Sequence, residues 1–262
     1  MGTRWNASLP NKLNLNATSF DKANAAACVA EAASVYNDPA TLTCAATDTR
    51  VLVVDLPDCI IIAFRGSKSL QNWLTDAQFW RRQIGATGEG GEVHHGFLDA
   101  HESIIGDLVK HLLAGHCKPI FVTGHSLGGA LAILAALELK RQGFAIAQVY
   151  TFGQPRVGNG AFKSRYDGAL GAQTFRVVYE EDIVPRVPHL PDFTDPYRHV
   201  GTEAFIPAFG CGDVIFNPSW LRLLASDGCG LYRAWHAGNV PALLADVLAD
   251  HHIVNYQNAF HL

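Results

Sequence analysis

The sequence predicts an α/β fold in which helices cover both faces of a mostly parallel central sheet. Short apolar, β-branched runs typical of buried parallel strands alternate along the chain with longer Ala- and Leu-rich segments typical of helices. Of the 262 residues, 48% are hydrophobic and 17% are charged, which suffices for one large core and argues against disorder. Because neither an internal repeat nor a linker interrupts the alternation, residues 1–262 are expected to form a single domain.

The first part of the chain is expected to contain a polar arm, two helices and two strands. Thr18 or Ser19 can cap the Ala-rich first helix, and Asn37-Asp38-Pro39 ends it. Two apolar or β-branched runs, separated by the turn residues Pro57-Asp58, are typical of strands. The second helix carries isoleucines and leucines along one stripe. The expected elements are an arm over 1–17, a helix over 20–36, strands over 50–56 and 59–65, and a helix over 97–113.

A short amphipathic segment lies between the second strand and the second helix. Leu70, Trp73, Leu74 and Ala77 recur at helical spacing and predict a helix over 70–77. A glycine-rich stretch follows and can serve as a flexible return to the domain. The periodicity alone does not separate a helix fixed on the core from one that moves.

A strand–turn–helix unit forms the centre of the chain. Ile120 to Thr123 reads as a buried parallel strand, and residues 127–142 are strong helix formers that Gly143 closes as a C′ residue. Between them lies Gly124-His125-Ser126-Leu127-Gly128, a G-x-S-x-G sequence. A serine on such a tight turn is held in strained backbone geometry with its hydroxyl exposed, and the glycines let neighbouring backbone pass close by. The helix N-terminus behind the serine favours a developing oxyanion.

The remaining chain continues the alternation of strands and helices up to a segment without clear periodicity. Residues 206–238 resist assignment and are interpreted as an insertion. Asn239-Val240-Pro241 opens a last predicted helix. The expected elements are strands over 147–152, 173–179 and 198–205, and helices over 160–170 and 241–248.

Composition excludes several classes of partner. The net charge of −4 gives no reason to expect binding to nucleic acid or to an anionic membrane. No apolar run reaches the length of a membrane span, so no transmembrane segment is predicted. The N-terminus, Met1 to Asn6, lacks the apolar stretch of a signal peptide, so the protein is expected to be cytosolic or to have lost a leader.

Cysteine and histidine spacing argues against a metal site or a redox motif. None of the six cysteines forms a C-x-x-C pair, and the doublets His94-His95 and His251-His252 lack the helical spacing of metal ligands, so no metal is predicted. The pairs Cys28 with Cys44 and Cys211 with Cys229 each close a local loop and are the better disulfide candidates. Cys59 and Cys117 begin two neighbouring strands and are interpreted as free thiols, with a bridge as the alternative.

The central serine suggests nucleophilic catalysis, which requires a base and an acid. In folds of this kind the chain order is serine, then Asp or Glu, then His. Asp182 follows the strand over 173–179 at the end where such sheets place ligands, and it is the predicted acid. A late loop histidine should be the base, which leaves His251 or His252. The competing acids are Glu180, Glu181, Asp192 and Asp195.

An oxyanion intermediate needs two hydrogen-bond donors. One should be the backbone N–H of Leu127, directly after the nucleophile. The other should come from the loop after the adjacent strand, where Ser67 offers its N–H and its hydroxyl. A simple glycine-containing turn at Gly66 is the alternative interpretation.

Several segments together resemble the class 3 lipases, the fungal Rhizomucor-type family. The resemblance is specific and covers most of residues 20–205 in order. The matching segments are Phe64-Arg65-Gly66-Ser67 with Trp73 and Asp76, Val93-His94-His95-Gly96-Phe97, Thr123 to Ala130, Thr151 to Asn159, Asp182-Ile183-Val184-Pro185, and Tyr197 to Glu203.

The resemblance implies an α/β-hydrolase fold with Ser126 as nucleophile, Asp182 as acid, and Ser67 and Leu127 as oxyanion donors. The family's histidine follows an aspartate, so Asp250 favours His251 over His252 as the base. The helix at 69–77 resembles the family's lid, and the insertion at 206–238 would lie near the site. The expected lid or substrate contacts are Leu70, Trp73, Leu74 and His125. Secretion is expected from the resemblance alone, and no metal or organic cofactor is implied.

The sequence therefore predicts a serine hydrolase of carboxylic esters, a triacylglycerol lipase or related esterase that acts on lipid or small esters, with a lipid–water interface as a possible partner. Alternatives are a phospholipase A1, a feruloyl-type esterase, or a non-catalytic regulator on the same scaffold. Acyl chain length, oligomeric state and compartment stay open.

Overall fold

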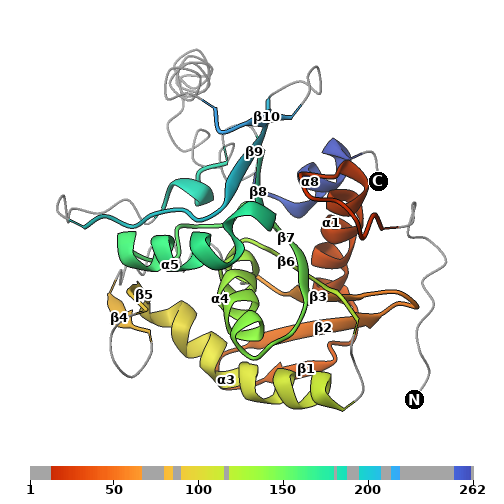
Figure 1. Ribbon diagram of the computed structural model, residues 1–262, viewed down its shortest axis with the longest axis horizontal. Coiled ribbons are helices and arrows are strands. Elements are labelled where there is room, and N and C mark those ends of the chain that lie inside the picture. Colours follow the sequence, from red (N-terminus) through yellow and green to blue (C-terminus); the bar gives the residue numbers. More distant parts are fainter. Residues whose placement is uncertain are drawn as a thin grey trace, which may run out of the picture.

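The fold is built around one large β-sheet. This computed structural model describes residues 13–66, 80–84, 90–114, 118–179, 182–187, 195–207, 214–218 and 251–260. Within these ranges eight strands form one sheet in the order β1-β2-β3-β6-β7-β8-β9-β10, and β4 pairs with β5 apart from it (Figure 1). The strands are β1 (Leu42–Cys44), β2 (Thr49–Asp55), β3 (Ile60–Phe64), β4 (Arg81–Gln83), β5 (Glu92–His94), β6 (Ile120–His125), β7 (Ile146–Phe152), β8 (Thr174–Tyr179), β9 (Thr202–Ile206) and β10 (Ile215–Phe216).

The middle of the sheet is parallel, as predicted. β3, β6, β7, β8 and β9 pair in parallel, whereas β1, β2 and β10 are joined antiparallel at the edges. Because parallel strands end at the same side of a sheet, the loops that follow β3, β6, β7 and β8 meet at one edge.

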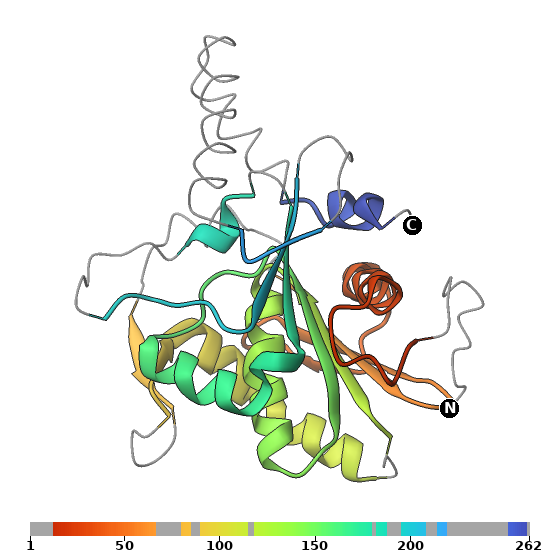
Figure 2. The same ribbon diagram turned by 45° about the horizontal axis from the view of Figure 1, so that its top comes forward.

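Helices cover both faces of the sheet (Figure 2). Alternating residues of the strands enter two cores: Ile60 and Ile62 face the first, and Ile61 and Phe121 face the second. The first core is covered by α3 (His95–Leu113), α4 (Leu127–Arg141) and α5 (Gly160–Leu170), and the second by α1 (Lys22–Asn37) and α8 (Ile253–Ala259). Two short 3₁₀ helices, η1 (Gly171–Gln173) and η2 (Val184–Arg186), complete the described elements. None of the described helices is long and apolar enough to cross a bilayer.

Element boundaries differ from the predictions mainly at caps and at short strands. The predicted caps Thr18 and Ser19 are wrong, because the side chain of Asp21 accepts hydrogen bonds from the N–H groups of Ala23 and Asn24 and begins the helix. Gly143 has a φ of +89° after α4, which confirms its predicted role as a C′ residue.

Four strands and one helix were not predicted. β1, β4, β5 and β10 have two or three residues each, which is too short for a period of two to be recognised. The predicted strand over 198–205 begins instead at Thr202, and α8 was missed. The helix predicted over 241–248 lies outside the described residues.

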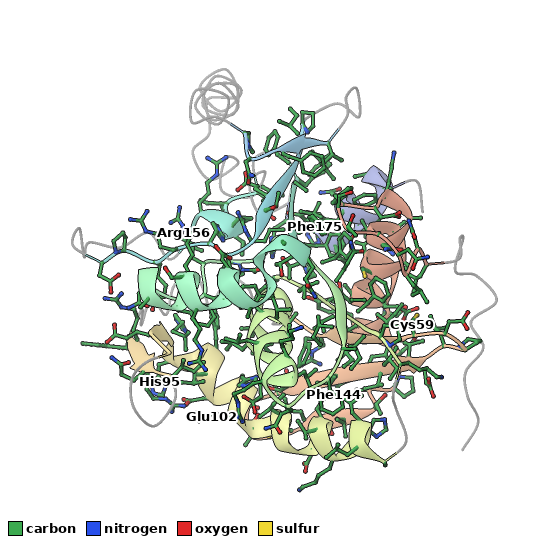
Figure 3. All side chains as sticks on the ribbon, viewed as in Figure 1. Cys59, His95, Glu102, Phe144, Arg156 and Phe175 are labelled. Atoms are coloured by element: carbon green, nitrogen blue, oxygen red, sulfur yellow. The ribbon has the colours of Figure 1, made fainter. Side chains whose placement is uncertain are left out.

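The predicted disulfide between Cys28 and Cys44 is wrong, because both residues are free thiols. Cys28 is a buried residue of α1 and belongs to the second core, whereas Cys44 packs against the first core, on the other face of the sheet. Cys59, labelled in Figure 3 just before β3, is also a free thiol, in agreement with the interpretation favoured above. Cys117, Cys211 and Cys229 lie outside the described residues.

Candidate active site

Ser126 occupies the turn between β6 and α4 in a strained backbone conformation. Its φ of 59° and ψ of −131° place a non-glycine residue in a sparsely populated region, at a cost of about 1–3 kcal/mol. The turn is held on both sides, since the Ser126 N–H donates to the Phe152 carbonyl oxygen and its own carbonyl accepts from the Gly129 N–H, each at 2.9 Å. The strained serine that the G-x-S-x-G sequence predicts is therefore present, but the predicted exposure is wrong, because Ser126 is only 2% exposed.

The two glycines of this sequence are required by close backbone approach. A Cβ atom at Gly124 would lie 2.2 Å from the Gly128 carbonyl oxygen, and one at Gly128 would lie 2.1 Å from the Phe64 carbonyl oxygen. Both distances are far shorter than any van der Waals contact. Strand β3, strand β6 and the first turn of α4 can consequently meet only because these positions lack side chains.

Asp182 lies just after β8, in a fully buried position. Its N–H donates to the Tyr179 carbonyl oxygen at 3.0 Å, and its Oδ1 accepts from the Val184 N–H at 2.9 Å. These bonds fix the carboxylate at the carboxyl edge of the sheet. A buried carboxylate needs such donors, because it has left its hydration shell.

His251 is paired with this carboxylate. Its Nδ1 lies 2.7 Å from Asp182 Oδ2 and 2.9 Å from Oδ1, and its side chain is 4% exposed. Since a carboxylate only accepts, Nδ1 carries a proton, and in the neutral form of the ring Nε2 then keeps a lone pair. Nε2 is buried and has no hydrogen-bond partner in the described structure. A neutral imidazole oriented in this way is suited to act as a general base.

A glycine makes room for the pair. Gly153, with a φ of +58°, follows β7, and a Cβ there would lie 2.7 Å from both Asp182 Oδ2 and His251 Cε1. The sequence Phe152-Gly153-Gln154 thus contributes space rather than a chemical group.

His125 joins the serine turn to the His–Asp pair. Its ring stacks on the ring of His251 with centroids 4.5 Å apart, and its Nε2 donates to the His251 carbonyl oxygen at 2.7 Å.

Ser126, Asp182 and His251, which the sequence analysis singled out, are therefore gathered at one edge of the sheet. His125 was expected to contact the lid or substrate, but it is 5% exposed and points to His251 instead.

Tyr256 is a site residue that the sequence analysis missed. Its hydroxyl donates to Asp182 Oδ2 at 2.5 Å and accepts from the Tyr179 N–H at 3.2 Å. It comes from α8, five positions after His251, and is fully buried. Nothing in the sequence indicated that its hydroxyl would reach the carboxylate of Asp182.

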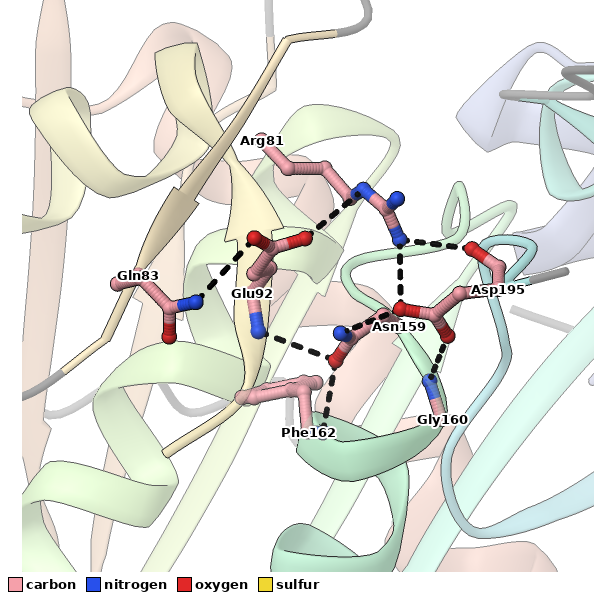
Figure 4. A network of polar contacts seen from close by, with 7 residues as sticks. All are labelled: Arg81, Gln83, Glu92, Asn159, Gly160, Phe162 and Asp195. Carbon is pink, nitrogen blue, oxygen red and sulfur yellow. Dashed lines mark hydrogen bonds and ion pairs between the residues drawn. The ribbon is translucent and has the colours of Figure 1, made fainter. Parts of the chain in front are cut away.

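The competing residues have other positions. Asp195 accepts hydrogen bonds from Arg81, Asn159 and Gly160 in a network with Glu92, away from the His–Asp pair (Figure 4). His252 is exposed and precedes α8. Leu127 is the first residue of α4, where its N–H belongs to the free end of the helix. The predicted site residues that lie outside the described ranges are Ser67, Leu70, Trp73, Leu74, Glu180, Glu181 and Asp192.

The described residues contain no group of three His, Cys, Asp or Glu side chains that could hold a metal ion. This edge of the sheet carries the strained Ser126 turn and the buried Asp182–His251 pair.

Comparison with known proteins finds that this chain is similar to lipases. The profile described as "Lipase (class 3)" matches residues 61–191. A lipase of Rhizomucor miehei is 39% identical over 169 residues, which cover 61% of this chain and 45% of that protein. The structure of a lipase from Rhizopus microsporus var. chinensis is 33% identical, with a TM-score of 0.57 over 69% of this chain and 64% of that one.

A second structure is informative about the site. A triacylglycerol lipase whose catalytic centre is a serine protease triad is 33% identical, with a TM-score of 0.57 over 68% of each chain. The first two relatives extend beyond the match, since the chain spans 44–45% of their length.

Proposed function

The chain belongs to the class 3 lipase family, with the α/β-hydrolase fold of that family, and on this premise we propose that it is a serine hydrolase of carboxylic esters that acts as a lipase. The observation that carries the proposal is the buried Asp182–His251 pair, with Nε2 of the histidine unpartnered, at the edge of the sheet where Ser126 forms its strained turn. Membership of the family supports the class of reaction, and this geometry supports the role that we assign to each residue.

The reaction proceeds through an acyl-enzyme. Nε2 of His251 takes the proton of the Ser126 hydroxyl while the oxygen attacks the ester carbonyl carbon. Asp182 stabilises the imidazolium that forms. The tetrahedral intermediate collapses when Nε2 returns the proton to the leaving alcohol. Water, deprotonated by the same nitrogen, then attacks the acyl carbon, and the carboxylic acid and Ser126 are released.

The developing negative charge is held by backbone donors. The N–H of Leu127 lies at the start of α4, where the helix dipole adds a partial positive charge. Ser67 is the proposed second donor. The residue before it supports this assignment, because a Cβ at Gly66 would lie 3.1 Å from the Cβ of Ser126, so Gly66 itself lies directly beside the nucleophile. No metal or organic cofactor is needed for any of these steps.

The test is hydrolysis of p-nitrophenyl esters from acetate to palmitate by the wild type and three variants. We expect Ser126→Ala and His251→Ala to lower kcat by about 10⁴-fold or more, as in other serine triads, and His252→Ala to stay near the wild type. Full activity of Ser126→Ala would refute the proposal. Loss of activity with His252→Ala alone would mean that the base is His252.

The substrate class is tested by the same series. Activity on long chains and on triacylglycerol emulsions identifies a lipase, and activity confined to short esters identifies an esterase. Hydrolysis of phospholipid vesicles, with release of the fatty acid at the first position, would instead identify a phospholipase A1. A wild type that fails to react with a fluorophosphonate at Ser126 would indicate a non-catalytic protein.

A further inference from the structure

A chain of hydrogen bonds runs behind the candidate active site, from the loop after β3 to the backbone of His251. The Gly66 N–H donates to the hydroxyl oxygen of Tyr36. Tyr36 Oη lies 3.1 Å from Nδ1 of His125, and Nε2 of His125 lies 2.7 Å from the His251 carbonyl oxygen. The chain joins residues that are 89 and 126 positions apart in sequence.

The His251 carbonyl oxygen, at one end of this chain, determines which group donates and which accepts in each hydrogen bond. A carbonyl oxygen only accepts, so Nε2 of His125 must carry a proton and donate. Burial lowers the pKa of His125 well below its usual range, and the nearby His251 lowers this pKa further. The ring is therefore neutral, and its Nδ1 is an acceptor. The Tyr36 hydroxyl must therefore donate to Nδ1, which leaves its oxygen free to accept from Gly66.

Tyr36 is suited to this task because its hydroxyl keeps its proton. Burial raises the pKa of Tyr36 to about 12, so the phenol is a permanent donor across the neutral range. A carboxylate in the same place would instead favour a protonated His125. That second charge would lie in a ring stacked 4.5 Å from His251, which must itself become positive during the reaction.

The neighbouring residues leave His125 little alternative. The ring of His251 stacks on the His125 ring, and the rings of Tyr36 and Tyr256 meet it in T-shaped contacts, with centroids 6.1 Å and 5.8 Å away. If the ring changed tautomer, a lone pair on Nε2 would face the lone pairs of the His251 carbonyl. The carbonyl would then be pushed away, and with it the residue whose side chain acts on Ser126.

We propose that Tyr36 and His125 are positioning residues: the Tyr36 hydroxyl fixes the tautomer of His125, and His125 holds the backbone of the catalytic histidine in line with the adjacent nucleophile. The inference rests on the proposed function, because positioning has meaning only if His251 is the base. In the proposed mechanism neither residue exchanges a proton with Ser126 or His251. Their effect is therefore on the rate of the chemical step and not on substrate binding.

The first experiment measures kcat and KM on p-nitrophenyl butyrate. We expect Tyr36→Phe to lower kcat about tenfold and His125→Leu about a hundredfold, with KM within about twofold of the wild type. His125→Gln keeps an amide N–H that can reach the His251 carbonyl whatever Tyr36 does, and should retain kcat within about threefold. The matched control is Tyr150→Phe, which removes a buried hydroxyl that also ties α1 to the sheet, through Asp21; its kcat should be unchanged.

The second experiment is a double-mutant cycle. In the His125→Gln background, Tyr36→Phe should change kcat by less than about twofold, because no tautomer remains to be fixed. An equal loss in both backgrounds, a rise in KM with kcat unchanged, or full kcat in His125→Leu would overturn the proposal. Circular dichroism melting curves identify any variant that fails to fold. If His125→Leu does not fold, the double-mutant cycle of Tyr36→Phe and His125→Gln still tests the proposal.

A third measurement does not depend on activity. The nitrogen-15 NMR signals of the histidine rings should show His125 as the Nε2–H tautomer in the wild type and as a mixture in Tyr36→Phe. An Nδ1–H tautomer in the wild type would refute the inference even in an active enzyme. An inactive wild type with the expected tautomer would instead refute the proposed function and leave His125 a purely structural residue.

Discussion

Three donors converge on the carboxylate of Asp182: Nδ1 of His251, the hydroxyl of Tyr256 and the N–H of Val184. Hydrogen bonds to a charged group are stronger than those between neutral groups, and each holds the carboxylate in one orientation. The orientation matters because the carboxylate in turn sets the tautomer and direction of the imidazole. In the proposed reaction Tyr256 therefore acts through Asp182.

Removing the Tyr256 hydroxyl should slow the reaction and destabilise the fold. We expect Tyr256→Phe to lower kcat about tenfold and the free energy of unfolding by about 1.5–3 kcal/mol, because the ring stays packed while a buried charged acceptor loses a donor. Ester hydrolysis and urea unfolding measure the two effects. Tyr166→Phe is the control, since its buried hydroxyl bonds to Thr174 at 3.0 Å, outside the site; it should lose stability only. Equal kcat in the two variants would show that Tyr256 does not position Asp182.

Single residues also mark the limit of what the sequence reveals. Ser126 and Asp182 were found because a turn motif and a strand end are local patterns. The positions of Tyr256 and His125 beside the His–Asp pair were not predicted. The bond from the Tyr256 hydroxyl to a carboxylate 74 positions earlier, for example, leaves no local signal in the sequence.

Among the elements, α5 and α1 differ in what their cap side chains bind. The cap of α1 is Asp21, whose side chain accepts only from N–H groups of its own helix apart from a bond with Asn14. The cap of α5 is Asn159, whose Oδ1 accepts from Phe162 and from Glu92 of β5, each at 3.0 Å (Figure 4). One side chain therefore caps the helix and joins it to a strand.

This difference predicts unequal costs for two cap deletions. Asp21→Ala should lower the free energy of unfolding by about 1 kcal/mol, the usual cost of a lost cap. Asn159→Ala should cost about 2–4 kcal/mol, because it also leaves the Glu92 N–H and Asp195 without that partner. Urea unfolding, with the slope m checked for constancy, measures both. Similar midpoints for the two variants would contradict the linking role of Asn159.

On the scale of the whole molecule, buried neutral histidines make the fold sensitive to acid. Burial lowers the pKa of His94 and His101 to about 4, and it lowers those of His125 and His199 well below the usual range. These four side chains lie in different parts of the structure. In the unfolded chain each would titrate near its ordinary value of about 6.5.

Stability should therefore fall as the pH falls through 6.5. Below that pH the unfolded chain binds protons that the folded protein does not, and for His101 the loss reaches about 2 kcal/mol at pH 5 and stops growing near pH 4. Urea unfolding at pH 7 and pH 5 measures this loss. In His101→Gln the loss should be smaller by about 2 kcal/mol, whereas the exposed control His252→Gln should match the wild type. An unchanged pH dependence in His101→Gln would refute the explanation.

The sequence by itself determined the fold class, the succession of parallel strands and the turn that presents Ser126. These features follow from local patterns: apolar runs, helix-forming segments and glycines where a Cβ would clash with neighbouring backbone. It also reduced the predicted base to two adjacent histidines, and the family resemblance favoured His251 because an aspartate precedes it.

Only the tertiary structure decided how these residues work together. It placed His251 with its Nδ1 on Asp182 and His252 in solvent, it separated Cys28 from Cys44 on opposite faces of the sheet, and it stacked His125 on His251. The physical reason is that burial and hydrogen bonding depend on which distant segments the sheet brings together. Side-chain partners 69 to 126 positions apart become neighbours only after the parallel strands have assembled.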